Sequence, residues 1–116
     1  GGLTIGNNVI ISRNIILYTV SHNYKGELLP FDNTSISKPV IIEDNVWIGT
    51  NVTIAPGTII REGAIIGIGC SIYGEIPVRA IVGSNGNIIG YRDEDHYRNL
   101  KELKKFCKEN GEEYKE

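Results

Sequence analysis

Aliphatic residues recur at every sixth position through the middle of the chain, and a second series of aliphatic or small residues follows four positions behind the first. The first series is Ile36, Ile42, Ile48, Ile54, Ile60, Ile66, Ile72 and Val78. The second series is Val40, Val46, Val52, Thr58, Ala64, Cys70, Ile76 and Val82. An amphipathic helix requires a period of about 3.6 residues and a half-buried strand a period of about 2. A period of six therefore indicates a repeat architecture.

The residues between the aliphatic positions indicate how each hexad turns. One position per hexad holds asparagine or glycine, which tolerate the positive φ angle that most side chains resist. These residues are Asn45, Asn51, Gly57, Gly63 and Gly69. Each hexad is expected to be a short extended stretch followed by a corner, so that three stretches close a triangular coil. Because one coil cannot bury its aliphatic side chains alone, the pattern predicts an all-β fold, a stacked parallel β-helix.

An insertion interrupts this pattern near the N-terminus. Ile5, Ile11 and Leu17 hold the inward position of the first hexads, but the distance from Leu17 to Ile36 is not a multiple of six. Residues 18–35 therefore form an inserted loop. Long irregular insertions in compact domains are usually functional or disordered. This one carries a histidine, two tyrosines and a phenylalanine, which favours a function.

A different pattern follows the repeat, which fades after Glu75. We expect residues 1–90 to form the β-helix and residues 91–116 to form a C-terminal helix and tail. Asp93 is expected to cap a helix that reaches Asn110. We expect its apolar stripe to pack against the domain itself, and a partner-binding helix is the alternative. The stripe consists of Tyr97, Leu100, Leu103, Phe106 and Cys107.

Composition narrows the class of protein. The chain has 116 residues and a formal net charge of −2, which suits one small domain and makes nucleic acid a poor partner. It has no apolar run of membrane-spanning length and no signal-peptide layout, so we expect a soluble, cytoplasmic protein without membrane insertion. Cys70 and Cys107 are expected to be reduced thiols rather than a disulfide framework.

The stretch NVWIGTNVTIAPGTIIREGAIIGIGCSI, which begins at Asn45, resembles the C-terminal signature of the hexapeptide-repeat acyltransferases. The resemblance is to the branch of maltose, galactoside and polysaccharide O-acetyltransferases, and it covers about residues 3–89. It implies a left-handed coil, whereas parallel crossovers are generally right-handed. It also implies an acetyl-coenzyme A-dependent O-acetyltransferase that acts on a sugar or polysaccharide. Finally, it implies a homotrimer with sites between subunits, because the family resembled here assembles in that way.

The resemblance also implies roles for three aromatic residues. His22 occupies the position of the general base, and a neutral imidazole suits removal of a hydroxyl proton. Trp47 is expected outside the coil, close to the catalytic histidine and the donor thioester. Tyr24 is a candidate for the acceptor pocket. The alternatives are a solvated loop histidine, a tryptophan that only covers the insertion, and a tyrosine that only anchors the loop.

The acyl donor is expected to lie in a groove along the coils. The family positions that contact it correspond to Gly49, Thr50, Gly67 and Ile68, and backbone N–H groups near the first two are candidates to stabilise the oxyanion. Small residues let a backbone approach a ligand closely, but plain corner geometry explains these glycines equally well. Cys70 is expected to point into the coil, which argues against a covalent route.

Two departures from the family affect donor binding. Tyr73 and Gly74 stand where relatives often carry a threonine-lysine pair that meets the nucleotide end of the donor, so the lysine charge is missing. The usual C-terminal basic residue is missing as well. Arg79, or else Arg92, is a candidate replacement, and Tyr73 and Arg79 complete the predicted donor contacts. The chain also starts directly in a hexad, where relatives have further coils, so we expect either a truncated product or a partner subunit that covers that end.

Two competing functions follow from the same residues. The missing basic residues favour a non-catalytic or degenerate β-helix scaffold. A zinc enzyme with this fold requires several histidine ligands, whereas the chain has two histidines, so we expect no metal. The acceptor, whether a free sugar, a polysaccharide or an antibiotic hydroxyl, is not determined by these patterns.

Overall fold

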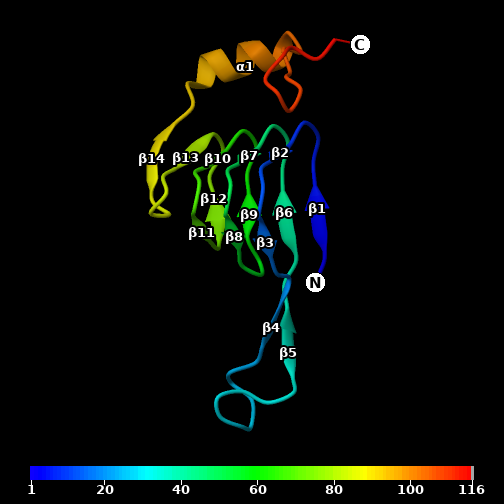
Figure 1. The fold of residues 1–116 in the computed structure, drawn as a ribbon, viewed down its shortest axis with the longest axis vertical. Helices are drawn as coiled ribbons and strands as arrows, with labels where there is room; N and C mark the ends of the chain where they lie inside the picture. Colours follow the sequence, from blue (N-terminus) through cyan, green and yellow to red (C-terminus); the bar gives the residue numbers. More distant parts are fainter. Residues whose placement is uncertain (116) are drawn as a thin grey trace.

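A computed structural model, which describes residues 1–115, shows a stack of coils with a hairpin projecting on one side and a helix lying across the opposite side (Figure 1). The molecule measures 55 × 30 × 22 Å along its principal axes. Three parallel sheets form the flat faces of the coils. The predicted parallel β-helix is therefore confirmed.

Each sheet is built from strands of successive coils, and we refer to the sheets as faces A, B and C. Face A contains β1 (Leu3–Ile5), β6 (Val40–Ile42), β9 (Ile59–Ile60) and β12 (Glu75–Ile76). Face B contains β2 (Ile10–Ile11), β7 (Trp47–Ile48), β10 (Ile65–Ile66), β13 (Ala80–Val82) and, antiparallel to β13, β14 (Ile88–Tyr91). Face C contains β3 (Ile16–Leu17), β8 (Thr53–Ile54) and β11 (Ser71–Ile72).

The strand register explains the six-residue period. Inward isoleucines eighteen positions apart pair on each face, so one coil contains three hexads. The pairs are Ile42 with Ile60, Ile48 with Ile66, and Ile54 with Ile72. The isoleucines at positions 42, 48, 54, 60 and 66 are at most 1% exposed, and each fully buried side chain contributes roughly 1.5–3 kcal/mol. Cys70 is buried among them, as predicted.

The corners have the backbone conformation that the asparagine and glycine positions predict. All five predicted corner residues have a positive φ: Asn45 59°, Asn51 60°, Gly57 82°, Gly63 76° and Gly69 74°. Asn8 and Asn14 turn the first coil in the same way, with φ angles of 55° and 59°. Since a longer or branched side chain is strained in this conformation, these residues determine where each coil bends.

The predicted series of inward residues is wrong at its end. Val78 lies between β12 and β13 and is 45% exposed, whereas Ile76 and Val82 are buried. The reason is a shortened corner at Gly74, whose φ is 74°. This corner places Ile76 only four positions after Ile72 and pairs it with Ile60. The aliphatic position therefore shifts by two residues in the last coil.

The prediction is also wrong at Ile36, whereas Ile5 and Ile11 hold the inward position and pair with the buried Ile42 and Ile48. Ile5 and Ile11 are 46% and 43% exposed, because the first coil has a neighbouring coil on one side only (Figure 1). Ile36 lies outside the coil, in β5 (Ser35–Ser37), which pairs antiparallel with β4 (Val20–His22). The insertion is thus a hairpin with a regular base and not a wholly irregular loop.

The C-terminal helix is shorter than predicted. Helix α1 spans Glu94–Glu102, and Asp93 caps it by accepting a 2.7 Å hydrogen bond from the backbone N–H of His96. It ends well before Asn110 because Lys104 adopts a left-handed conformation, with a φ of 55°, which is a common way to stop a helix. The helix lies along the coils, as expected, but buries none of its residues. Residues 1–115 form no helix with the length and apolarity that a membrane crossing needs.

Close approach of successive coils explains two glycines better than corner geometry does. Neither Gly49 nor Gly67 has a positive φ. A Cβ atom on Gly67 would lie 2.6 Å from the carbonyl oxygen of Val82 on the next coil, and one on Gly49 would lie 2.9 Å from the backbone nitrogen of Ile68. The stacking distance of the coils therefore requires glycine at both positions, with or without a ligand.

We predict that Gly67→Ala lowers the free energy of unfolding by about 1–3 kcal/mol, because overpacking against a fixed backbone is destabilising. Urea unfolding followed by circular dichroism measures this. Gly90→Ala is the matched control, since a Cβ there meets no atom within 4 Å. Equal stabilities of the two variants would contradict the prediction.

Candidate functional site

Four of the predicted donor contacts come together on the edge between faces B and C. Gly49 and Thr50 follow β7, and Gly67 and Ile68 follow β10, one coil further on. The backbone N–H of Gly69 donates to the carbonyl of Thr50 over 2.8 Å, which stacks the two corners directly. Ile68 is 66% exposed on this edge. The spacing of eighteen residues brings these positions together, as the sequence predicts.

Trp47 lies beside this edge on face B. It pairs with Ile10 on β2 and Ile65 on β10, and its side chain is 50% exposed. It therefore points away from the coil interior, as predicted. It also lines a cavity of about 540 Å³ between face B and the C-terminal segment, together with Ile10, Leu100 and Phe106.

The two remaining donor candidates lie on other edges. Tyr73 stands at the corner between β11 and β12 and is 81% exposed. Arg79 stands at the corner between β12 and β13, where its guanidinium donates to the carbonyl of Arg92 over 3.0 Å and lies 3.9 Å from Glu94. Arg92 in turn donates to the carbonyl of Gly63 over 2.8 Å. Both arginines therefore attach the segment before α1 to the coil, and a donor contact by Arg79 remains a prediction.

His22 lies at the outer end of β4, on the projecting hairpin. Its imidazole stacks on the ring of Phe31, with ring centroids 3.8 Å apart and an interplanar angle of 14°. The residue is exposed, and no residue of the described chain forms a hydrogen bond with the ring. Tyr24 is also exposed, and the ammonium group of Lys25 lies 5.8 Å from its ring centroid.

The tip of the hairpin is organised by one carboxylate. Asp32 accepts hydrogen bonds from the backbone N–H groups of Glu27 and Thr34, over 2.8 and 2.9 Å, and from the hydroxyl of Thr34. These donors, the hydroxyl of Thr34 foremost, lower the pKa of Asp32 below its ordinary value. The carboxylate is therefore charged at neutral pH and keeps the loop folded back on itself.

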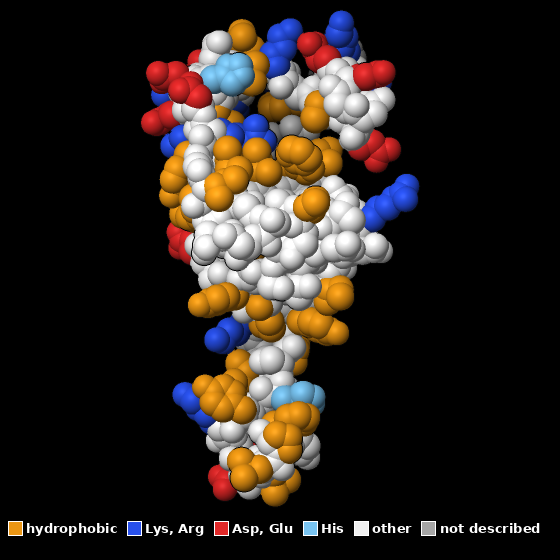
Figure 2. Space-filling view, turned by 60° about the vertical axis from the view of Figure 1, so that its left-hand side comes forward, with side chains coloured by type: hydrophobic (Ala, Val, Ile, Leu, Met, Phe, Trp, Pro, Cys, Tyr) orange, Lys and Arg blue, Asp and Glu red, His pale blue; other side chains and the backbone are white. Residues whose placement is uncertain are grey.

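Within one chain the structure does not bring His22 and Trp47 together. The cavity that Trp47 lines contains no residue of the hairpin. The hairpin and helix α1 also lie on opposite sides of the coil (Figure 1). In Figure 2 hydrophobic side chains gather on the coil below the C-terminal segment, along the opposite edge of the coil where the hairpin begins, and on the hairpin itself. Among residues 1–115, no group of three or more histidine, cysteine or acidic side chains could hold a metal ion.

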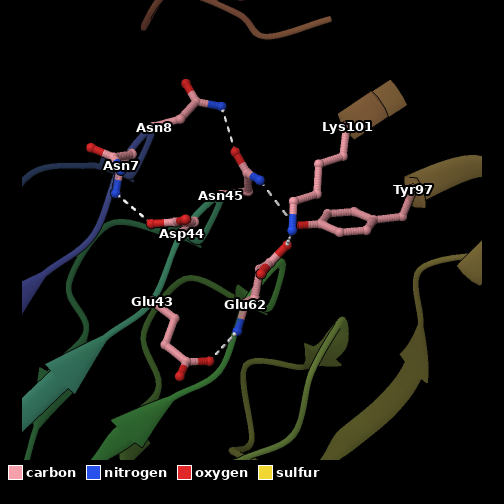
Figure 3. A network of polar contacts seen from close by, with 8 residues as sticks. All are labelled: Asn7, Asn8, Glu43, Asp44, Asn45, Glu62, Tyr97 and Lys101. Carbon is pink, nitrogen blue, oxygen red and sulfur yellow. Dashed lines mark hydrogen bonds and ion pairs between the residues drawn. The ribbon is translucent and has the colours of Figure 1, made fainter. Parts of the chain in front are cut away.

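A polar network that sequence reasoning missed holds α1 on the edge between faces A and B (Figure 3). The hydroxyl of Tyr97 accepts a 3.0 Å hydrogen bond from the amide of Asn45 and donates over 2.7 Å to Glu62. Lys101 lies 2.7 Å from the same carboxylate, and Asn8 donates to Asn45 over 2.8 Å. The sequence signal was a tyrosine in an otherwise apolar stripe, since a partly buried tyrosine hydroxyl usually finds a hydrogen-bond partner.

The environment of Tyr97 favours the neutral phenol. Burial raises its pKa to about 12; the hydrogen bond from Asn45 acts in the opposite direction, and the carboxylate of Glu62 adds to the rise. Glu62 also raises the pKa of Lys101, through their hydrogen bond. At neutral pH the network therefore contains a neutral phenol between an amide and an ion pair.

Comparisons with known proteins agree with this geometry. A family model described as the hexapeptide repeat of succinyl-transferase matches residues 39–73. The chain is 37% identical over 79 residues to the galactoside O-acetyltransferase of Escherichia coli K12, which covers 68% of this chain and 38% of that protein. A maltose O-acetyltransferase from Clostridium difficile 630 superposes with a TM-score of 0.71 at 33% identity, covering 79% of this chain and 49% of that one.

A hexapeptide-repeat acetyltransferase from Vibrio cholerae O1 biovar eltor, solved with acetyl coenzyme A, superposes with a TM-score of 0.70 at 30% identity. That match covers 78% of this chain and 50% of the other. The chain belongs to the hexapeptide-repeat acyltransferase family. The predicted left-handed coil is confirmed by this relationship. This hexapeptide-repeat protein spans half or less of the length of these three relatives.

We predict that Tyr97→Phe lowers the free energy of unfolding near pH 8 by about 0.5–3 kcal/mol, because it leaves Asn45 and Glu62 without their shared partner. The pKa of Tyr97 is higher in the folded chain than its ordinary value of 10.0. Its contribution to stability is therefore complete below pH 10 and is lost as the pH rises toward 12.

Urea unfolding followed by the fluorescence of Trp47, which lines the cavity beneath α1, measures both effects. Between pH 10 and 12 the wild type should lose more stability than Tyr97→Phe. Tyr114→Phe, an exposed tyrosine of the same C-terminal segment, is the control. The pKa assignment would be contradicted by parallel losses in the wild type and Tyr97→Phe.

Proposed function

We propose that this protein transfers an acetyl group from acetyl-coenzyme A to a hydroxyl of a sugar or polysaccharide, with His22 as the general base. The observation that carries the proposal is an exposed imidazole on a hairpin that projects from a hexapeptide coil similar to O-acetyltransferases. Solved relatives contain acetyl coenzyme A or coenzyme A, which supports this donor.

The proposed reaction is a direct transfer. The acceptor hydroxyl donates a hydrogen bond to an imidazole nitrogen of His22. Its oxygen then attacks the thioester carbonyl while the proton passes to the imidazole. The C–O bond forms, the negative charge collects on the carbonyl oxygen, and the intermediate collapses by breaking the C–S bond. The departing thiolate then takes the proton from the imidazolium, so that protons and electron pairs balance.

Two observations bear on the oxyanion donor and on the choice between direct and covalent transfer. The backbone N–H of Gly49 donates to the carbonyl of Ile66 over 2.8 Å, so of the two candidate oxyanion donors the N–H of Thr50 remains. Cys70 is buried and its thiol donates to the carbonyl of Gly83 over 2.8 Å. A thiol held inside the coil does not reach a substrate, which supports direct transfer over a covalent route.

The site is proposed to lie between two copies of the chain. His22 and Trp47 occupy separate surfaces of one chain, so a site that uses both residues requires the hairpin of one copy to face the coils of the next. The exposed apolar side chains of the hairpin, Leu28, Leu29 and Phe31, are suited to such a contact. A homotrimer, as the family resemblance implies, supplies three equivalent sites.

We predict that His22→Ala lowers kcat by roughly 10²- to 10⁴-fold, the usual contribution of a positioned general base. Thiol release from acetyl-coenzyme A, measured with a panel of sugars and oligosaccharides, gives the rate. His96→Ala is the control, because His96 lies on the exposed side of α1. Full turnover by His22→Ala with the best acceptor would show that another group is the base.

The scaffold hypothesis retains one specific observation in its favour. Gly74 stands where relatives often carry the lysine, and the guanidinium of Arg79 already donates to the backbone carbonyl of Arg92 and lies 3.9 Å from Glu94. Few charges are therefore available for the nucleotide end of the donor. Calorimetric titration with acetyl-coenzyme A distinguishes the two hypotheses. Measurable binding supports the enzyme, and its absence at millimolar donor supports the scaffold.

We also predict complementation between inactive variants. If His22 of one copy works with face B of its neighbour, a mixture of His22→Ala and Trp47→Ala chains contains some sites with both native residues. Unfolding and refolding such a mixture should recover activity that neither variant has alone. Light scattering should show trimers for both variants. Trimers without any recovered activity would indicate that both residues act within one chain, whereas full activity of Trp47→Ala alone would show that Trp47 is dispensable.

A further inference from the structure

We propose that Phe31 is a positioning residue that orients His22 by stacking, in place of the carboxylate or carbonyl that usually fixes a histidine base. The inference rests on the proposed function of His22 as a general base. It assigns to the hairpin tip a task beyond carrying the histidine, namely to hold its ring in one orientation before the acceptor arrives.

A histidine base normally has a partner group that orients its ring. This partner usually holds one ring nitrogen, so that the other points at the substrate. None of residues 1–115 forms a hydrogen bond with the imidazole of His22. The specific interaction that the described chain gives this ring is the stack on Phe31, with centroids 3.8 Å apart and planes at 14°. The stack covers a face of the imidazole and leaves its edge, where both nitrogens lie, available.

The loop holds the two rings together from both sides. Asn23, which follows His22, donates from its side-chain amide to the hydroxyl of Thr34 over 3.2 Å and from its backbone N–H to the carbonyl of Thr34 over 3.1 Å. Asp32, which follows Phe31, accepts from the hydroxyl and the backbone N–H of the same threonine. Thr34 therefore joins the two chain segments that carry the stacked rings.

The position of Phe31 argues against a purely structural role. The hairpin stands outside the coil interior (Figure 1), and Phe31 is 42% exposed, so it contributes nothing to the buried core of the coil. Leu28 and Leu29 are apolar and even more exposed in the same loop, yet neither has a ring that could stack on the imidazole. Phe31 is thus the neighbour that restricts how the imidazole rotates.

The test compares Phe31→Leu, which keeps an apolar side chain but removes the ring, with Phe31→Tyr, which keeps the ring. Stacked aromatic pairs are worth enough to change the population of one orientation by roughly 2- to 12-fold. We expect Phe31→Leu to lower kcat by about that factor with little change in KM, and Phe31→Tyr to restore it. Glu27→Ala is the control in the same loop and should behave as wild type, because its side chain is exposed and its backbone N–H can still donate to Asp32.

A second readout does not depend on turnover. The ring current of Phe31 should shift the carbon-bound imidazole protons of His22 upfield in the NMR spectrum, and the His22→Ala spectrum identifies them. The shift should disappear in Phe31→Leu and persist in Phe31→Tyr and Glu27→Ala. Loss of the shift together with the lower kcat supports the inference.

Other outcomes would overturn it. Wild-type kcat in Phe31→Leu, or unshifted imidazole protons in the wild-type protein, would show that the stack does not orient the base. An increase in KM alone would make Phe31 an acceptor contact. A wild type without transferase activity toward any acceptor would refute the proposed function, and the NMR shift would then decide separately whether Phe31 orients His22.

Discussion

The packing of inward isoleucines between successive coils is the constraint on which the rest of the molecule depends. Each of Ile48, Ile54 and Ile60 is completely buried, and each pairs with an isoleucine of the next coil through the parallel register. This contact sets the distance between coils, and that distance leaves no room for a Cβ atom at Gly49 or Gly67. Corners follow from the same constraint, because the chain must turn after every short strand.

The interior of the coil has no space for a substrate or a cofactor. It is filled by aliphatic side chains, Thr58 and Cys70, so every candidate functional group lies outside it. The hairpin carries His22, face B carries Trp47, and the C-terminal segment covers part of that face. These elements are held by polar or aromatic contacts rather than by burial, since α1 buries none of its residues. Such contacts leave the outer elements easier to move than the coil.

Several charged side chains on the outer surface already bond to other parts of the same chain. Arg79 and Arg92 bond to backbone carbonyls, and Lys101 shares the carboxylate of Glu62 with Tyr97. A nucleotide at the end of the coil would have to compete with these partners. Weak donor binding, or a donor held mainly along the edge between faces B and C, agrees with this distribution.

The sequence by itself determined the coil, its corners and the stacking of Gly49 and Thr50 beside Gly67 and Ile68, because a repeat of six residues is a local pattern that implies a fixed spacing of eighteen. It did not reveal the shift at Val78, the early end of α1 at Lys104, or the place of Tyr97. Only the tertiary structure decided these, since each depends on partners far away in the chain, such as Asn45 and Glu62 for Tyr97. In the candidate site, too, one part follows from the sequence and another from the tertiary structure. A motif locates His22, but the ring that faces it is set by how the hairpin folds back through Thr34, and no period in the sequence encodes that contact.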